Sequence, residues 1–124
     1  MNNMRDTILI ADDQEMNRVI LSNIFQNHYH ILEAENGEQA QLMVEQYHHK
    51  LAVMLLDIFM PVKNGYEVLQ DIRDQGYLSE FPVIIITAEN TAENEVQAFD
   101  YGAADIIMKP FEPHDLQYRY FHLS

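Results

Sequence analysis

Short apolar runs alternate with longer amphipathic stretches along the chain, and there are five of each. Three of the runs, 8–10, 51–56 and 83–86, are almost continuously apolar, which is typical of strands buried on both faces of a parallel sheet. The pattern predicts five strands, at 7–11, 29–34, 51–56, 82–87 and 105–108.

The amphipathic stretches repeat apolar residues at a helical period, so each predicts a helix with one face on the core. The last stretch, 112–124, is expected to be helical as well. The five predicted core stripes are Met16, Val19, Ile20 and Ile24; Ala40, Met43, Val44 and Tyr47; Val68, Leu69 and Ile72; Ala92, Val96, Phe99 and Ala103; and Leu116, Tyr120 and Leu123.

Local signals agree with these helices. Gly76 and Gly102 follow helical stripes, as C-terminal capping glycines do. Two pairs have the spacing of an N-terminal capping box: Asn36 with Gln39, and Asn90 with Glu93. Alternating strands and helices predict one (βα)5 domain over residues 1–124, an α/β fold with a doubly wound, five-stranded parallel sheet.

Composition adds limits on function. The 124 residues include 20 acidic and seven basic side chains, for a net charge of −13, and no cysteine. Such a domain is not expected to bind nucleic acid or anionic membranes directly, although it can attract Mg²⁺ and basic partner surfaces.

The sequence contains no run of about 18 apolar residues, so no membrane span is predicted, and 1–6 does not resemble a signal peptide. We expect a cytoplasmic protein.

Acidic residues follow two of the predicted strands. Asp12 and Asp13 come after the first strand, and Asp57 comes after the third. Ligands of open α/β sheets bind at the carboxyl ends of the strands. At about 4 Å, two carboxylates repel by roughly 4 kcal/mol at an effective dielectric of 20, so a cluster needs a cation. Oxygen ligands that leave room for water and phosphate favour Mg²⁺.

Hydrogen-bond donors stand at the ends of the fourth and fifth strands. Thr87 ends the fourth strand and the small Ala88 comes next, and Lys109 directly follows the fifth strand. A hydroxyl and an ammonium group can hold phosphoryl oxygens. A carboxylate nucleophile, a cation site and two donors are the parts needed for phosphoryl transfer to Asp57. Each residue alone could be a helix cap or a turn residue, but five coincidences at one edge favour a shared site.

Five motifs follow one another along the chain, at 8–13, 55–65, 84–88, 102–105 and 109–111. In these motifs the sequence resembles the receiver domains of bacterial two-component response regulators, over about 7–123. The resemblance implies the flavodoxin-like strand order 2-1-3-4-5. It also implies Mg²⁺ as cofactor and a histidine kinase or phosphotransfer protein as partner.

The resemblance assigns a role to each residue of the expected site. Asp57 would accept the phosphoryl group from a kinase phosphohistidine. Asp13 and Asp57 would bind Mg²⁺, Asp12 would act through water, and the Phe59 carbonyl would be a further metal ligand.

By the same resemblance, Thr87 and the Ala88 amide would hold the phosphoryl oxygens and Lys109 would pair with them. The bond from Lys109 to Pro110 would be cis. Pro61 and Gly65 would shape the loop that follows Asp57.

One position departs from the family. Receivers often carry an aromatic switch residue in the fifth strand, where this chain has Ile106. Phosphorylation does not need that ring, but the usual rotamer signal cannot operate in the same form. The interpretation is that movement of Thr87 and of the fourth helix carries the signal.

Several alternatives remain. A flavin-binding protein would need a phosphate loop where Asp12 and Asp13 stand, and an aspartyl phosphatase would need an acid at Phe59. No glycine-rich loop indicates a nucleotide site. A degenerate receiver that only binds proteins is the main rival.

The domain is expected to be a switch that catalyses only its own phosphorylation and dephosphorylation. The kinase, the output domain or downstream protein, and homodimerisation stay open, as does excision from a longer regulator.

Overall fold

The computed structural model describes residues 4–89 and 91–121. Its centre is a sheet of five parallel strands in the order β2-β1-β3-β4-β5. This confirms the predicted fold class and strand order. The predicted limits are correct to within one residue, because continuous apolar runs mark buried strands well. The strands are β1 (Thr7–Ala11), β2 (His30–Ala34), β3 (Leu51–Asp57), β4 (Val83–Thr87) and β5 (Asp105–Met108).

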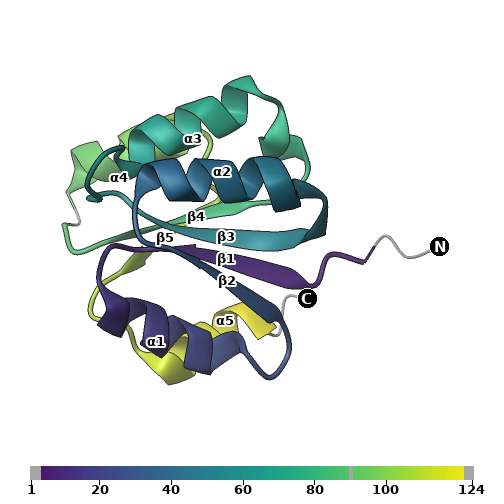
Figure 1. The fold of residues 1–124 in the computed structure, drawn as a ribbon. Coiled ribbons are helices and arrows are strands. Elements are labelled where there is room, and N and C mark those ends of the chain that lie inside the picture. Colours follow the sequence, from purple (N-terminus) through teal and green to yellow (C-terminus); the bar gives the residue numbers. More distant parts are fainter. Residues whose placement is uncertain (1–3, 90, 122–124) are drawn as a thin grey trace.

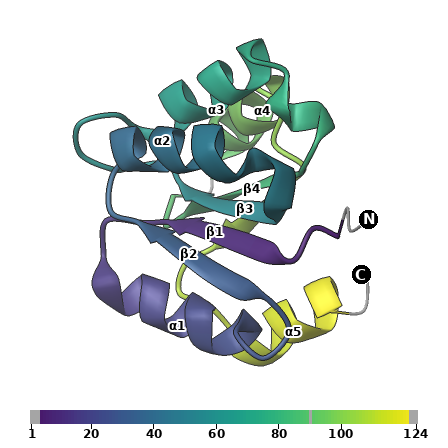
Figure 2. The same ribbon diagram turned by 45° about the vertical axis from the view of Figure 1, so that its right-hand side comes forward.

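Helices cover both faces of the sheet. In Figures 1 and 2, α2, α3 and α4 lie on one face, and α1 and α5 lie on the other. The helices are α1 (Glu15–Phe25), α2 (Gly37–Tyr47), α3 (Gly65–Asp74), α4 (Ala92–Asp100) and α5 (Pro113–Phe121), with 3₁₀ turns η1 (His48–Lys50) and η2 (Tyr77–Ser79). Among the described residues, no helix is long and apolar enough to cross a membrane.

The core has one apolar layer on each face of the sheet. Alternate residues of a strand face opposite sides, so Leu9 joins the layer under α2, α3 and α4, while Ile8 and Ile10 join the layer under α1 and α5. All five residues of β1 are buried, as are all five of β4. These two layers hold the strand ends that carry the polar residues in fixed positions.

The predicted stripe of α1 is wrong in part. Ile24 is buried, but Met16 is 70% exposed and Val19 is 44% exposed. The helix instead presents Leu21, Ile24 and Phe25 to the core, and the same face carries the buried Arg18. Apolar residues occur on two sides of this helix, so periodicity alone selected a face that is rotated away from the sheet.

The predicted stripe of α4 is also wrong in part, because only Ala103 of its four residues is buried. Val96 is 60% exposed and Phe99 is 50% exposed, and Ala92 lies on the surface. Ala98 is the buried residue of this helix, and Ala103 packs in the core beyond its end. A small alanine lets α4 lie close to the sheet, while its larger apolar side chains face outward. The stripe of α3 packs as predicted, as do Ala40, Met43 and Val44 of α2 and Leu116 of α5, whereas Tyr47 is half-buried and lies outside the core clusters. Tyr120 and Leu123 lie outside the side chains that the structure describes.

The helix caps follow the sequence only partly. The Asn36 side chain accepts the Gln39 N–H at 2.8 Å, but the Gln39 side chain accepts from Glu35 rather than from Asn36. Gly76 and Gly102 have φ angles of 85° and 106°, left-handed values that confirm them as capping glycines.

Two other caps differ from the prediction. Asn90 lies outside the described residues, and the N-cap of α4 is Thr91, whose hydroxyl accepts the Asn94 N–H at 3.1 Å. A full capping box starts α3, between Asn64 and Glu67. The Asn-x-x-Glu spacing at 64–67 is the sequence signal of this box.

Candidate functional site: an acidic cluster at the carboxyl edge of the sheet

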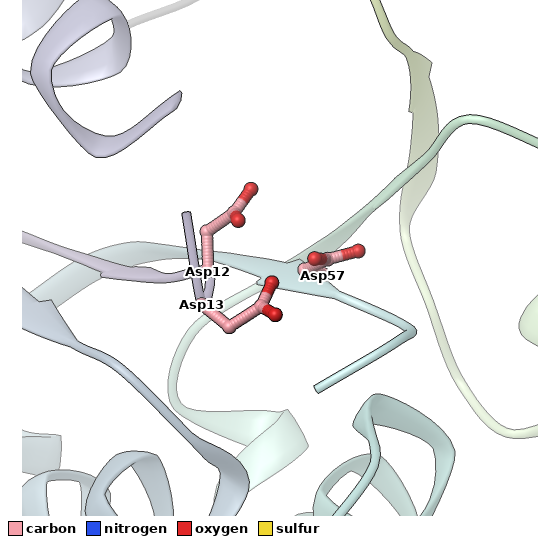
Figure 3. A group of neighbouring side chains, drawn as sticks. All are labelled: Asp12, Asp13 and Asp57. Carbon is pink, nitrogen blue, oxygen red and sulfur yellow. The ribbon is translucent and has the colours of Figure 1, made fainter. Parts of the chain in front are cut away.

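The three predicted aspartates come together at one edge of the sheet. Asp12 and Asp13 follow β1 and Asp57 ends β3, and these two strands are neighbours. One carboxylate oxygen from each residue lies within 4.8 Å of the other two (Figure 3). Asp12 and Asp57 are buried, at 0% and 3% exposure, whereas Asp13 is exposed. The cluster therefore has a buried base and one open side.

Asp12 is held at several atoms. Its N–H donates to the Ala34 carbonyl at 3.1 Å, and its Oδ1 accepts the Gln14 N–H at 2.9 Å. Its Oδ2 is buried and makes no hydrogen bond within the described part of the chain. The Lys109 Nζ lies 3.0 Å from this oxygen, which is close enough for an ion pair, but the contact does not have the geometry of a hydrogen bond. A buried carboxylate oxygen in this state has capacity for a further cation or donor.

Asp57 is the central carboxylate. Its Oδ1 accepts the Phe59 N–H at 3.3 Å, and its Oδ2 accepts a hydrogen bond from Lys109 Nζ at 3.2 Å. Burial raises the pKa of Asp57 to about 6, and the charge of Asp12 adds to this rise while Lys109 partly offsets it. The carboxylate is therefore less stable than an ordinary aspartate in the absence of a divalent cation.

Lys109 is the cation of this edge. Burial lowers the pKa of its ammonium group, but the attraction of Asp12 and Asp57 outweighs burial and the pKa lies above its ordinary value. Its backbone N–H donates to the Thr87 carbonyl at 2.9 Å, which fixes the start of the turn after β5. The bond from Lys109 to Pro110 is cis, as the family resemblance implied.

Thr87 stands at the end of β4 and is buried. Its hydroxyl accepts the Glu89 N–H at 3.0 Å and donates to the Glu89 carbonyl at 3.2 Å. Ala88 is exposed beside it. Both residues lie at the predicted edge, but the Thr87 hydroxyl is engaged with the loop before α4.

The loop after Asp57 is closely packed. A Cβ added to Gly65 would lie 2.3 Å from the Asp57 carbonyl oxygen, so a side chain there would displace the strand end that carries Asp57. Val62 has a φ angle of 72°, which a β-branched residue adopts only at a cost. No sequence pattern around Val62 indicates this strain. Phe59 is 54% exposed; the role of its carbonyl as a metal ligand stays a prediction.

The edge can hold a hard cation. Its ligands are carboxylate oxygens, they are close enough to share one ion, and one buried oxygen lacks a hydrogen bond. The residues thus form an acidic cluster that is compatible with a divalent metal site. Ile106, at the usual position of the aromatic switch, is half-buried against the core layer under α2, α3 and α4.

Solved structures place the fold in a known class. The chain superposes on the chemotaxis protein CheY4 of Vibrio cholerae with a TM-score of 0.85 and 25% identity, over 96% of this chain and 98% of the other. It superposes on the receiver domain of Francisella response regulator 1452 with a TM-score of 0.82 and 27% identity, over 95% of each chain. The fold is therefore that of a CheY-like domain.

The family is shown directly. The model of the response regulator receiver domain matches residues 8–120, and the chain belongs to that family. It is 32% identical to a probable transcriptional regulator, ycf27, of Pyropia yezoensis over 96% of this chain and 47% of that protein. It is 36% identical to a probable cyclic di-GMP phosphodiesterase of Vibrio cholerae over 84% of this chain and 23% of that protein. The chain thus spans half or less of the length of these curated relatives.

Proposed function

We propose that this receiver domain is a phosphoryl-accepting switch in which Asp57 takes a phosphoryl group from the phosphohistidine of a histidine kinase or phosphotransfer protein. The observation that carries the proposal is the position of the Asp57 carboxylate. It lies 3.2 Å from the Lys109 ammonium and beside two further carboxylates at the open edge of the sheet. A structure described as a BeF3-activated DrrB receiver domain, 26% identical to this chain, supports the same chemistry.

The proposed transfer is a simple exchange of bonds. An Asp57 carboxylate oxygen attacks phosphorus and forms a P–O bond, the P–N bond to the imidazole breaks, and its electron pair returns to that nitrogen. Lys109 stays paired with the developing phosphoryl charge. Asp13 and Asp57 would hold Mg²⁺ with the Phe59 carbonyl, and Asp12 would act through water. When bound, the ion would offset the negative charge of the phosphoryl oxygens.

The raised pKa of Asp57 is compatible with this function. Near pH 7 a carboxyl group with a pKa of about 6 is still mostly ionised, so the nucleophile is available. Its ionised form is poorly stabilised by its surroundings, which favours binding a cation there. The domain would act on itself alone and turn over no external substrate. A cytoplasmic location is part of the proposal.

The signal would leave through the loop before α4. The Thr87 hydroxyl holds both backbone groups of Glu89, and the Asn94 side chain donates to the Glu89 carbonyl at 3.4 Å. The Tyr66 hydroxyl of α3 in turn donates to the Asn94 carbonyl at 3.4 Å. A phosphoryl oxygen that attracts the Thr87 hydroxyl would release Glu89 and loosen the first turn of α4. This route does not need an aromatic residue at 106.

The output attached to this switch is a further proposal. Relatives named as a transcriptional regulator and as a phosphodiesterase carry their matching segment in longer chains. We propose that this domain likewise controls an output domain or a downstream protein. Homodimerisation on phosphorylation, and the absence of direct nucleic-acid or membrane binding, stay predictions.

The decisive test is the intact mass of the protein after incubation with acetyl phosphate. The wild type should gain about 80 Da with Mg²⁺ and nothing without it, and Asp57→Asn should gain nothing. A folded wild type that gains no mass under either condition would favour the rival, a degenerate receiver that acts only by binding partners. Unchanged amide shifts over 96–101 on phosphorylation would contradict the α4 route.

A further inference from the structure

Arg18 is a buried cation next to the acidic cluster, and it has no role in the proposed phosphoryl transfer. It lies on the core-facing side of α1 with 8% exposure. Its Nη1 donates to the Asp12 carbonyl at 2.8 Å and its Nε donates to Glu33 Oε1 at 2.9 Å. Its Nη2 lies 3.8 Å from Glu35 Oε1. One guanidinium group therefore joins α1, the end of β1, the end of β2 and the loop that follows.

Removing the Arg18 guanidinium from water costs free energy, and ion pairs with Glu33 and Glu35 alone do not require that burial. Glu33 and Glu35 are 45% and 68% exposed, so an arginine could meet them from the surface with its charge in water. Instead, the guanidinium is buried and directs one N–H at a main-chain carbonyl. The planar, forked head of arginine can bond both partners at once, which the single ammonium of lysine cannot do in the same geometry.

The carbonyl that Arg18 binds belongs to the peptide between Asp12 and Asp13. Fixing this peptide plane fixes the relative positions of both Cα atoms and so restricts the directions in which the two side chains leave the backbone. The Asp12 N–H and Oδ1 are already held by Ala34 and Gln14. With the Arg18 bond, the main chain at Asp12 is held on both sides, and Oδ2 remains as the atom without a hydrogen bond.

We infer that Arg18 is a positioning residue of the cation site: it holds the Asp12–Asp13 peptide so that both carboxylates face Asp57 at a separation that one divalent ion can bridge. This inference rests on the proposed function for the presence of the ion. Groups that orient metal ligands from behind typically change metal affinity by about 10–100-fold when they are replaced. Arg18 should therefore act on affinity for Mg²⁺ more than on the transfer step itself.

The test compares Mg²⁺ binding by the wild type, Arg18→Lys and Arg18→Met. Dissociation constants are measured on the unphosphorylated proteins by calorimetry or by amide shifts of 12–14. The half-saturating Mg²⁺ concentration for phosphorylation by acetyl phosphate is measured beside them. Arg18→Lys should weaken Mg²⁺ binding by about tenfold, yet reach nearly the wild-type rate when Mg²⁺ saturates. A residue that only stabilises the fold would not produce this split between affinity and rate.

Arg73→Lys is the matched control, because Arg73 is exposed on α3 and its guanidinium pairs with Asp74 at 3.6 Å. It should leave the Mg²⁺ dissociation constant unchanged. Arg18→Lys keeps the charge and much of the volume, so it can test the inference even if Arg18→Met does not fold. A folded Arg18→Lys with a dissociation constant within twofold of the wild type would overturn the inference. A wild type that binds no Mg²⁺ and takes no phosphoryl group would instead overturn the proposed function.

Discussion

Replacing Asp57 with asparagine should stabilise the metal-free domain above pH 6 and have little effect near pH 4. The folded protein raises the pKa of Asp57 from 3.8 to about 6, chiefly by burial, so the folded state prefers the protonated carboxyl. Stability from this group is present below pH 3.8 and is lost as the pH rises through about 6. A shift of about two units corresponds to about 3 kcal/mol above pH 7.

Asparagine resembles the protonated carboxyl in size and charge, so it should recover most of that 3 kcal/mol. The assay is urea unfolding in EDTA at pH 4 and pH 7.5, with Asp74→Asn as control because Asp74 is exposed on α3. Added Mg²⁺ should stabilise the wild type at pH 7.5 but not Asp57→Asn. If Asp57→Asn is no more stable than the wild type at pH 7.5, or if its advantage persists at pH 4, the electrostatic account of the site is wrong.

Three further predictions concern the surroundings of the site and the opposite end of the sheet. Val62→Asn should raise the free energy of unfolding by about 1 kcal/mol in urea titrations, because asparagine tolerates the left-handed φ of 72° better than valine. Tyr66→Phe removes a hydrogen bond worth about 1 kcal/mol to the α4 backbone, so hydrogen exchange of α4 amides should speed up roughly fivefold. Glu80 bonds His48 and Arg5, and chiefly the His48 hydrogen bond holds its pKa below the ordinary 4.5. Its stabilisation is present above pH 4.5 and is lost as the pH falls through the lowered pKa, so Glu80→Gln should lower the urea midpoint at pH 6, and the difference from the wild type should shrink as the pH is lowered below 4.5.

The sheet was predictable because its three central strands, β1, β3 and β4, are apolar on both faces. In a run such as 83–86 both faces of the strand are apolar and both are buried. The strand and its limits can therefore be predicted without knowing which helices pack against it. Helix faces are different, because a short helix can show apolar residues on two sides. Met16 and Val96 have the right period but face outward, while Arg18 and Ala98 face inward. Which face packs depends on contacts between elements, which periodicity does not contain.

The members of the site were predictable for a related reason. Asp57 and Lys109 each follow an apolar run directly, and the topology of a parallel sheet brings such positions to one edge. The hydrogen bonds that hold the site residues in place could not be predicted from the sequence. Arg18 reaches the Asp12 carbonyl from a helix that starts three residues later, and the Thr87 hydroxyl is bonded to Glu89. These contacts join side chains to backbone atoms of other residues, and a sequence motif carries little information about them.

The charges at this edge suggest why phosphorylation would move the loops around it. When ionised, three carboxylates and one lysine give a net charge of −2, from three negative charges and one positive charge. A phosphoryl group on Asp57 would replace one negative charge with nearly two, which makes the net charge nearly −3 with Lys109 already counted. A bound divalent ion would therefore still leave nearly one negative charge at this edge. The additional oxygens then need donors, and the buried Thr87 hydroxyl is close in the sheet but committed to Glu89. Satisfying the phosphoryl group therefore requires breaking contacts in the loop before α4, and in this chain that step would convert a charge at Asp57 into a change at a helix.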